Sequence, residues 1–307
     1  MAKGSARAEV EVEGRRLTLS NLGKIFYPET GFTKGDVIDY YARIAPVMVP
    51  HLEGRATTLV RFPDGVEGPH FYEKNSPSHR PEWVTVAPLW SRHNGGNINF
   101  TVVDSAATLV WMANLASIEV HPSLALVSDY KAPTSVVFDL DPGPPAGVVE
   151  CCDVALQLRE VFDQLKLECV VKTSGSKGLQ AYVPLNSPVT YDQTKPFALA
   201  LAQLLEKRNP GFVTSNMAKD IRPGKVFVDW SQNDEHKTTV AVYSMRAKTS
   251  RPTVSAPVSW AEIEACAESR DPESLVFLAG DVLERVAEQG DLFACMLDSE
   301  QELPRLS

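Results

Sequence analysis

Two aspartates separated by a single residue, Asp139 and Asp141, are the residues of this chain most suited to chemistry. They close the apolar segment 134–142, whose composition is typical of a β-strand. Because side chains alternate along a strand, both carboxylates lie on one face and the intervening large apolar side chains lie on the other. Carboxylates crowded on an apolar strand repel each other and resist burial unless a cation lies between them. Their hard oxygen atoms therefore predict a Mg²⁺ or Mn²⁺ site, although an isolated Asp-x-Asp pair is also common in turns.

The segments around this pair follow the order β-α-β-β-α-β, which is the split-βαβ or ferredoxin-like unit. The expected strands are 134–141, 168–173, 179–185 and 225–230, and the expected helices are 149–165 and 193–207. In this topology the spatial order of the strands is 4-1-3-2, so the first strand lies between the third and the fourth. The fold class is therefore α/β (α+β), with the aspartate pair on an inner strand.

A third carboxylate, Asp229, lies on the fourth strand, and Gln180 and Tyr182 lie on one face of the third. If the helices cover the apolar faces, these polar residues share an uncovered face with the aspartate pair. The sequence does not give the register between strands, so we predict only that Asp229 comes from a strand adjacent to the pair. Three such carboxylates can hold two divalent ions, an arrangement that supports in-line phosphoryl or nucleotidyl transfer.

The glycine-rich segment 174–178 links the second and third strands. Its backbone N–H groups, the hydroxyl of Ser174 and the ammonium of Lys177 could form a nest for triphosphate oxygens. The segment is not a Walker A loop, because its spacing differs and a strand follows it where that motif requires a helix. An ordinary hairpin turn is an equally good interpretation of the same residues.

Further cations and a histidine lie near these motifs in the sequence. His121 precedes Pro122, which we expect to end its segment, and a lone histidine is commonly a packing residue. Five basic residues surround Asp229 in sequence and could neutralise phosphates or form a solvated face: Arg222, Lys225, Lys237, Arg246 and Lys248.

The N-terminal part alternates cations with aromatic residues. We expect a helix over 34–48 with Thr33 as its N-cap, a short strand near 9–12, and strands near 57–62, 83–87 and 98–103 with a helix near 105–116. Cations interleaved with aromatic rings suit nucleic acid, but such rings are also common in cores. The two pairings are Lys24 and Lys34 around Phe26-Tyr27, and Arg61-Phe62 before Phe71-Tyr72.

The composition bounds the class of protein. A chain of 307 residues can bury a substantial core, and it has no apolar run long enough for a bilayer span and no apolar signal-peptide core near its N-terminus. We therefore expect a cytoplasmic protein with no membrane partner. Its five cysteines include no C-x-x-C pair, so we expect reduced packing residues. The net charge of −9 comes from residues 261–307, with twelve acidic residues and three arginines; the rest is neutral, so any polyanion contact is local.

With these motifs assembled, the chain resembles the bacterial primase-polymerases of the archaeo-eukaryotic primase superfamily, and in particular the polymerase domain of the end-joining DNA ligase D. The resemblance covers about residues 17–257 and rests on four motifs: Lys24-Ile-Phe-Tyr-Pro, Val136-Val-Phe-Asp-Leu-Asp-Pro-Gly, Thr173-Ser-Gly-Ser-Lys-Gly-Leu and Gly224-Lys-Val-Phe-Val-Asp-Trp-Ser-Gln-Asn. It implies one primase-polymerase domain over 1–307. Within it we expect an N-terminal α/β module (1–120), a catalytic core with the split-βαβ sheet (121–260) and an acidic helical section (261–307).

The resemblance also implies an activity and partners. The family's reaction is nucleotidyl transfer onto a primer 3′-hydroxyl with two Mn²⁺ (or Mg²⁺) ions, often with ribonucleotides, during gap filling or break repair. The partners are then gapped or broken duplex DNA with a 5′-phosphate, and NTP or dNTP. Since no ligase or nuclease segment is recognised, we expect the protein to act alone or with a separate ligase or end-binding protein, in the nucleoid of the cytoplasm.

Roles of individual residues follow from the resemblance by motif. Asp139, Asp141 and Asp229 match the metal ligands. The positions that contact the incoming nucleotide are His121, Ser174, Lys177, Gln180 and Arg246, and the positions that contact DNA are Asn21, Lys24 and Lys34 at a downstream 5′-phosphate, Arg61 and Phe71 at the template, and Arg222. Gln180 departs from the family, which carries histidine there, and glutamine donates a hydrogen bond but cannot become cationic. The segment between His121 and Asp139 is also short and lacks the usual aromatic residue.

Two other functions fit parts of the sequence. A catalytically weak module could bridge DNA ends for a separate ligase, although such a scaffold has no need for three mutually repelling carboxylates. A haloacid-dehalogenase-type phosphatase also carries Asp-x-Asp after an apolar strand, but here Pro142 replaces the expected Gly-Thr and the motif lies in mid-chain.

Overall fold

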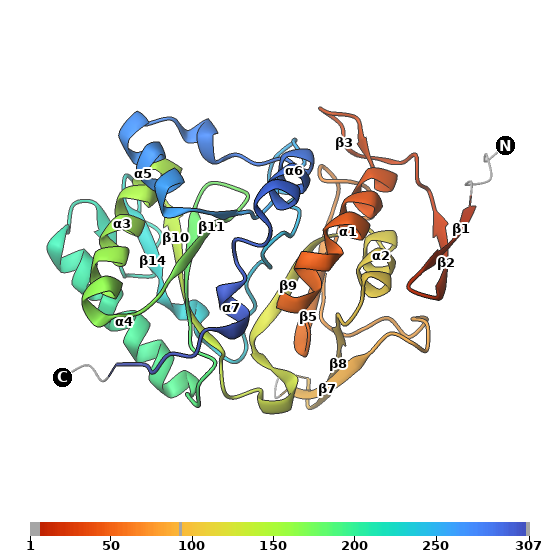
Figure 1. Cartoon of the computed structure of the whole chain (residues 1–307), viewed down its shortest axis with the longest axis horizontal. Coiled ribbons are helices and arrows are strands. Elements are labelled where there is room, and N and C mark those ends of the chain that lie inside the picture. The colour runs from red at the N-terminus through yellow and green to blue at the C-terminus, as the bar shows by residue number, and fades with distance from the viewer. Residues whose placement is uncertain (1–6, 92–93, 305–307) are drawn as a thin grey trace.

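The fold is built on two β-sheets, with part of the C-terminal segment between them (Figure 1). The computed structural model describes residues 7–91 and 94–304. The N-terminal residues 1–5, for which the sequence predicts no signal peptide, lie outside the described residues. Within the described ranges, no helix is long and apolar enough to cross a membrane.

The larger sheet contains the split-βαβ unit. Its spatial order is β13-β14-β10-β12-β11-β15, so the predicted order 4-1-3-2 is confirmed for its four central strands. All neighbouring strands in it are antiparallel except β13 and β14, which are parallel. The two short edge strands were not predicted. The six strands are β10 (Ser135–Pro142), β11 (Val170–Thr173), β12 (Leu179–Pro184), β13 (Val213–Thr214), β14 (Val226–Asp229) and β15 (Pro257–Val258).

Helices α3 (Val148–Leu165) and α4 (Tyr191–Arg208) pack on one face of this sheet, as the apolar pattern predicts. Phe138 and Leu140 of β10 are fully buried on that face. The Phe138 ring lies 5.4 Å from the Phe162 ring of α3, centroid to centroid. Burial of this continuous apolar layer fixes which side of each strand carries the polar residues.

The register brings four polar residues into one row across the sheet. Lys172 of β11 lies opposite Gln180 of β12, Gln180 lies opposite Asp139 of β10, and Asp139 lies opposite Asp229 of β14. Side chains directly opposite on neighbouring strands are roughly 5 Å apart at Cβ, so each member of the row lies beside the next. Asp141 lies one step along, opposite Phe227. The predicted adjacency of Asp229 to the aspartate pair is thereby confirmed.

The second face of the sheet is not open, so the prediction of an uncovered face is wrong. Gln180 and Tyr182 are both buried. The Tyr182 hydroxyl donates to Thr239 Oγ1 at 3.2 Å, and its ring packs edge-on against Phe293 at 5.4 Å. The chain after β14 and the C-terminal segment cover this face because the aromatic ring gains from removal from water. The end of the face with Asp139 and Asp141 remains accessible through a cavity.

The N-terminal part forms the smaller sheet and two short hairpins. Strand β5 lies at the centre of this sheet, with β9 on one edge and β8 and β6 on the other. Helix α1 begins and ends as predicted, and Thr33 caps it in a reciprocal bond with Asp36. The elements are β1 (Arg7–Val12), β2 (Arg15–Ser20), β3 (Ile25–Tyr27), β4 (Phe32–Thr33), α1 (Lys34–Met48), β5 (Arg55–Arg61), β6 (Phe71–Glu73), β7 (Val86–Ser91), β8 (Gly96–Val102), α2 (Ala106–Asn114) and β9 (Ser117–Leu126).

Strand β9 continues through Pro122, so the predicted break at that proline is wrong. The Pro122 carbonyl accepts a hydrogen bond from the Thr239 N–H at 3.2 Å, and Val120 O accepts one from Ala241 N–H at 2.9 Å. A proline is tolerated here because it keeps its carbonyl and lacks only the N–H group. The returning segment therefore runs along β9, and β9 carries His121 toward the larger sheet.

Buried tyrosines join the two sheets. The Tyr27 hydroxyl donates to Arg246 O at 2.7 Å, and the Tyr40 hydroxyl donates to Tyr243 O at 2.8 Å. Tyr41 receives the N–H of Met245 at 3.1 Å. Because Phe26 and Tyr27 are fully buried, the core interpretation of this aromatic pair is the correct one. These bonds fix the backbone of the segment that carries Arg246.

The acidic C-terminal section packs onto the fold. Helix α6 lies against α1 near the junction of the two halves (Figure 1). Asp291 accepts hydrogen bonds from His51 Nε2 at 2.8 Å and from the Tyr243 hydroxyl at 2.6 Å. The section thus stabilises the junction, while the division of the chain at 120 and 260 stays a prediction. Its helices are α5 (Trp260–Ser269), α6 (Ala279–Gln289) and α7 (Cys295–Asp298).

Candidate active site

A cavity of about 330 Å³ opens at the junction of β10, the glycine-rich turn and the segment after β14. The fold brings seven of the predicted site residues to its wall, although they come from segments up to 125 residues apart in the sequence: His121, Asp139, Asp141, Ser174, Lys177, Gln180 and Arg246. The cavity therefore has a carboxylate end and a cationic end.

The carboxylate end is electrostatically strained. Burial and the charges of Asp141 and Asp229 together raise the pKa of Asp139 to about 7, although a hydrogen bond from Gln180 and the charge of Lys172 oppose the shift. A divalent cation would relieve this repulsion. The hard carboxylate oxygens fit Mg²⁺ or Mn²⁺ chemically, so the donor set suits the metal that the sequence predicts.

Asp229 is held differently from the other two carboxylates. Its Oδ1 accepts the Ser231 N–H at 2.9 Å, and its Oδ2 accepts from Gln232 Nε2 at 2.9 Å. Among the residues that the structure describes, no three metal-ligating side chains form a compact group. The three aspartates therefore share one face of the sheet, but the carboxylate of Asp229 is turned toward the loop that follows β14.

The loop after β14 is anchored by a side chain that completes the sheet. The Asn233 amide accepts the Val137 N–H at 2.9 Å and donates to Val137 O at 2.8 Å. The Asn233 side chain is fully buried, and it satisfies the backbone N–H and C=O of Val137 in the way that a residue of a neighbouring strand would. This anchor directs the following segment back over the carboxylates to form one wall of the cavity.

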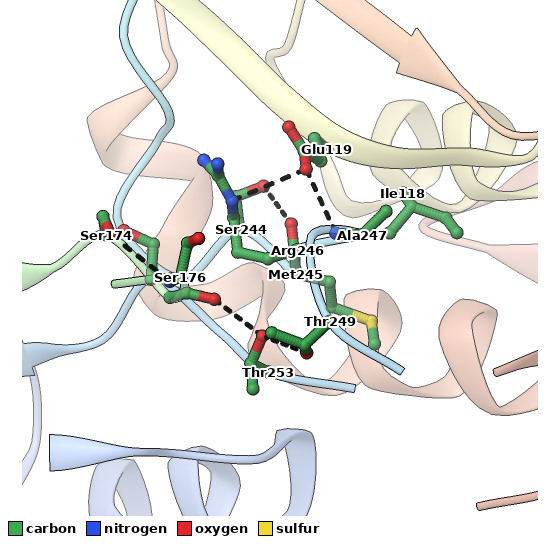
Figure 2. A network of polar contacts seen from close by, with 12 residues as sticks. Ile118, Glu119, Ser174, Ser176, Ser244, Met245, Arg246, Ala247, Thr249 and Thr253 are labelled. Atoms are coloured by element: carbon green, nitrogen blue, oxygen red, sulfur yellow. Dashed lines mark hydrogen bonds and ion pairs between the residues drawn. The ribbon is translucent and has the colours of Figure 1, made fainter. Parts of the chain in front are cut away.

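The cationic end is organised by Glu119, a fully buried carboxylate on β9. Figure 2 shows Arg246 extending toward it, with Arg246 Nε 3.5 Å from Glu119 Oε1, and the Ala247 N–H donating to the same oxygen at 3.1 Å. His121 Nε2 lies 2.9 Å from Glu119 Oε2. Burial alone would raise the pKa of Glu119, but His121, Arg246 and the Ala247 N–H lower it to about 2. Glu119 therefore stays ionised and holds the His121 ring and the Arg246 guanidinium at the cavity wall.

The glycine-rich turn packs tightly against this end of the cavity. Ser174 Oγ accepts the N–H groups of Ser176 and Gly178 at 3.3 and 3.1 Å, and Thr253 donates to Gly175 O (Figure 2). A Cβ atom on Gly175, whose φ is +66°, would lie 2.5 Å from Arg246 Cγ. Glycine is therefore required for the turn to approach the arginine. The turn is both a hairpin connection and a wall of the cavity, so the two interpretations of this segment are compatible.

Arg222 lies beside the carboxylates. Its guanidinium stacks over the Phe227 ring at 3.7 Å, and its Nη1 is 3.9 Å from Asp141 Oδ2. The aromatic ring fixes the plane of the guanidinium, because a stacked arginine loses little rotational freedom when it binds a further anion. This residue was predicted to contact DNA, and its position at the edge of the carboxylate end is compatible with a strand that reaches the site.

A second cationic site lies on the N-terminal part and does not line the cavity. The Lys34 ammonium is buried and donates to Ser20 O at 2.7 Å and to Asn114 Oδ1 at 2.9 Å. Burial, together with the charges of Lys24 and Arg61, lowers the pKa of Lys34 to about 8. Three cations thus lie close enough to repel one another, which favours an anionic ligand.

The remaining predicted DNA-contact residues surround this cluster. Asn21 has the left-handed φ of +57° in the turn before Lys24, whose ammonium pairs with Asp64 at 2.7 Å. Arg61 lies 5.2 Å from the exposed Phe71 ring and pairs with Glu73 at 3.0 Å. Together Arg61 and Phe71 present a cation and an exposed ring on one strand pair, as stacking of a base requires.

Three site residues were missed by sequence reasoning: Glu119, Lys172 and Asn233. Glu119 and His121 are two apart on one strand, so the alternation of side chains could have paired them. Lys172 and Gln180 lie the same number of residues before and after Ser176, the centre of the hairpin turn. The hairpin register could therefore have placed them opposite each other. Asn233 gives no comparable signal, because its role depends on the tertiary path of the loop.

Comparison with known proteins places this site in a family. Residues 33–293 match the family described as LigD, primase-polymerase domain. The multifunctional non-homologous end joining DNA repair protein LigD of Mycobacterium tuberculosis is 42% identical over 286 residues, which cover 91% of this chain and 36% of that protein. The bifunctional non-homologous end joining protein LigD of Bacillus subtilis is 29% identical over 290 residues, which cover 94% of this chain and 45% of that protein.

The structural comparison agrees with the sequence match. The polymerase domain from Mycobacterium tuberculosis ligase D, solved in complex with DNA, matches with a TM-score of 0.84 and 40% sequence identity. The match covers 92% of this chain and 98% of that one. The chain thus spans about a third of the length of the mycobacterial LigD protein (36%) and nearly all of its polymerase domain.

We predict that Glu119→Gln raises the KM for nucleotide by roughly tenfold or more, because His121 and Arg246 lose a charged anchor worth about 1.5–3 kcal/mol. Steady-state primer extension against nucleotide concentration measures this. Glu262→Gln, which removes a hydrogen-bonded carboxylate at the start of α5, is the matched control and should leave the KM unchanged. An unchanged KM in Glu119→Gln would contradict the anchoring role.

The same variant should change the acid stability of the protein. The folded-state pKa of Glu119 is about 2, against 4.5 for an ordinary glutamate, so its contribution is present above pH 4.5 and is lost as the pH falls toward 2. This shift corresponds to roughly 3 kcal/mol at neutral pH. Urea unfolding at pH 7 and pH 3 should show a stability difference between wild type and Glu119→Gln that shrinks at the lower pH.

Proposed function

Because this chain belongs to the LigD primase-polymerase domain family, we propose that it is a template-directed nucleotidyltransferase that extends primer 3′-hydroxyl ends at short gaps or breaks in DNA. One observation carries this proposal: a single cavity has paired carboxylates at one end and a set of basic and hydroxyl side chains at the other. In-line transfer needs both ends, because metal ions act on the reacting oxygens while cations hold the leaving phosphates.

Asp139 and Asp141, together with Asp229 from the adjacent strand, are the residues we propose as ligands of Mn²⁺ or Mg²⁺, with two ions in the complete site. Bound there, the ions would activate the 3′-hydroxyl oxygen and stabilise charge on the transferred phosphorus centre. The fit rests on the donor chemistry and on the repulsion that raises the pKa of Asp139. For Asp229 to take part, its carboxylate must share or release its bonds to Ser231 and Gln232.

The phosphate end provides donors in fixed positions. Since the Glu119 carboxylate only accepts hydrogen bonds, the proton of the His121–Glu119 bond resides on His121 Nε2, which leaves Nδ1 for a ligand. Burial lowers the pKa of His121 and so disfavours a second proton on the ring. Nδ1 can donate a hydrogen bond to a triphosphate oxygen only if it carries that second proton, so the bound triphosphate has to favour its uptake. Arg246, Lys177 and the hydroxyl of Ser174 complete the set that we propose for the triphosphate.

The proposed DNA contacts divide into two regions. Lys24, Lys34 and Asn21 would grip a downstream 5′-phosphate, because the mutual repulsion of the cations is relieved by a dianion. Arg61 and Phe71 would meet the template by stacking. A role in repair of double-strand breaks, with a separate ligase to seal the product and ribonucleotides as favoured substrates, completes the proposal.

The alternative of a catalytically weak module that bridges DNA ends has one observation in its favour. Asp229 is bonded within its own loop, and the described residues contain no compact three-ligand group. Such a protein would bind broken ends without extending them. The phosphatase interpretation has no such support, because the chain belongs to a polymerase-domain family.

Extension of a primer across a short gap tests the proposed function directly. We expect nucleotide addition that requires a divalent ion, is faster with Mn²⁺ than with Mg²⁺, and is faster with NTPs than with dNTPs. A gapped duplex incubated with each of the four metal and nucleotide combinations measures this. Binding to the duplex without extension in any combination would favour the end-bridging alternative.

A 5′-phosphate on the downstream strand should strengthen binding of the gapped duplex. Charge-assisted hydrogen bonds are worth about 1.5–3 kcal/mol, so we expect a preference of roughly tenfold or more, measured by fluorescence anisotropy with matched duplexes. Lys24→Gln should reduce this preference, whereas Lys207→Gln at the exposed end of α4 should preserve it. Equal affinity of the wild-type protein for both duplexes would reject the proposed pocket.

A further inference from the structure

A lysine that belongs to no predicted site lies beneath the carboxylate end of the cavity. Lys172 is on β11 and only 1% exposed, yet its neighbours on the sheet are polar. Its Nζ lies 2.6 Å from Gln180 Oε1 and 2.7 Å from Ser255 Oγ. A buried amine is costly unless it is fully engaged, so its presence calls for a function beyond the packing of β11.

The hydrogen bonds around Lys172 run in one direction. Ser255 donates its only hydroxyl proton to Thr173 O at 2.7 Å, so its oxygen must accept from the lysine. The other short bond of Lys172 is donated to Gln180 Oε1. The amide nitrogen of Gln180 is then left to face Asp139, and it donates to Asp139 Oδ1 at 3.2 Å.

The reverse orientation of the Gln180 amide is excluded by these partners. It would place the carbonyl oxygen of Gln180 against the carboxylate of Asp139, and the amide hydrogens against the lysine that has to donate. Lys172 thus determines which end of Gln180 meets the aspartate. The row across the sheet continues to Asp229, opposite Asp139, so the lysine stands at one end of a line whose other end is anionic.

We propose that Lys172 is a positioning residue for the metal site, which acts through Gln180 to fix the carboxylate of Asp139 toward a bound divalent cation. This inference rests on the proposed function, because it assigns a role relative to the same metal site. It also gives Gln180 a function. Its amide oxygen accepts from Lys172 and its amide nitrogen donates to Asp139, so the position of Lys172 determines the position of the carboxylate. This link requires a donor and an acceptor on one side chain.

Burial and the charge of Arg246 lower the pKa of Lys172 well below its usual value, and the charge of Asp139 opposes this shift. Ser255, the second anchor of Lys172, donates its N–H to Ser244 O at 2.9 Å, and the Arg246 N–H bonds to Thr253 O at 2.8 Å. Lys172 therefore lies between the strand of Asp139 and the hairpin that carries Arg246.

A double-mutant cycle with Mn²⁺ binding as its readout tests the proposal. Lys172→Met and Gln180→Met are each expected to weaken Mn²⁺ binding by roughly tenfold or more, as loss of an outer partner of a ligand usually does. The double variant should lose no more than Gln180→Met alone, because Lys172 acts through that residue. Electron paramagnetic resonance of free and bound Mn²⁺, with protein alone, gives the affinities without reference to catalysis.

Control and failure outcomes are distinct. Val171→Ala, on the opposite face of β11 and equally buried, should lower the urea midpoint without changing the Mn²⁺ affinity. Wild-type Mn²⁺ affinity in folded Lys172→Met or in Gln180→Met, or additive losses in the double variant, would overturn the proposal. If Lys172→Met does not fold, Lys172→Gln replaces it in the same cycle.

The cycle also separates this inference from the proposed function. A wild-type protein that binds Mn²⁺ but does not extend primers would refute the proposed polymerase and leave the role of Lys172 to be decided by the cycle. A wild-type protein that extends primers with unchanged Mn²⁺ affinity in both single variants would refute the positioning role alone.

Discussion

Repulsion among three carboxylates on neighbouring strands is the constraint on which the rest of this structure depends. Asp139 lies opposite Asp229 and two residues from Asp141, on a face of the sheet that is largely removed from water. Such a cluster is unfavourable in an apolar interior, so its surroundings have to supply positive charge or hydrogen-bond donors. Gln180 supplies an N–H group, and Lys172 and Arg222 supply charge from either side. The same arrangement leaves room for a divalent cation.

The other end of the cavity carries hydrogen-bond donors, which need a buried acceptor to hold them. There the chain holds hydrogen-bond donors in place with one buried carboxylate, Glu119, which is shared between His121 and Arg246. The segment that carries Arg246 is in turn fixed by tyrosine hydroxyls from the N-terminal part. The two halves of the fold are therefore both needed: the larger sheet provides the carboxylates, and the smaller sheet positions His121 and Arg246 through Glu119.

Much of the fold could be predicted from the sequence, because hydrophobic periodicity and turn residues act locally. The strand order, the bounds of α1 and the adjacency of Asp229 to the pair all followed from such patterns. Register could not be obtained in the same way, and register is what aligns Lys172 with the aspartates. The covered second face depends on a distant segment, 239–244, and β9 continues through Pro122 because it pairs there with β5; both arrangements form only in the tertiary structure. Seven of the site residues found through the family motifs lie at one cavity, whereas the residues that support them required the structure.

The central claim is that the carboxylate row is the reacting centre of a polymerase. Primer extension by Asp139→Asn on gapped DNA, with the binding of that DNA measured in parallel, tests it most directly. The substitution is nearly isosteric, and it removes a carboxylate charge that the site disfavours, since the pKa of Asp139 is raised to about 7. The fold should therefore be retained or stabilised. The account predicts that extension is abolished with Mn²⁺ and with Mg²⁺ while DNA affinity is unchanged. Extension at the wild-type rate would contradict it.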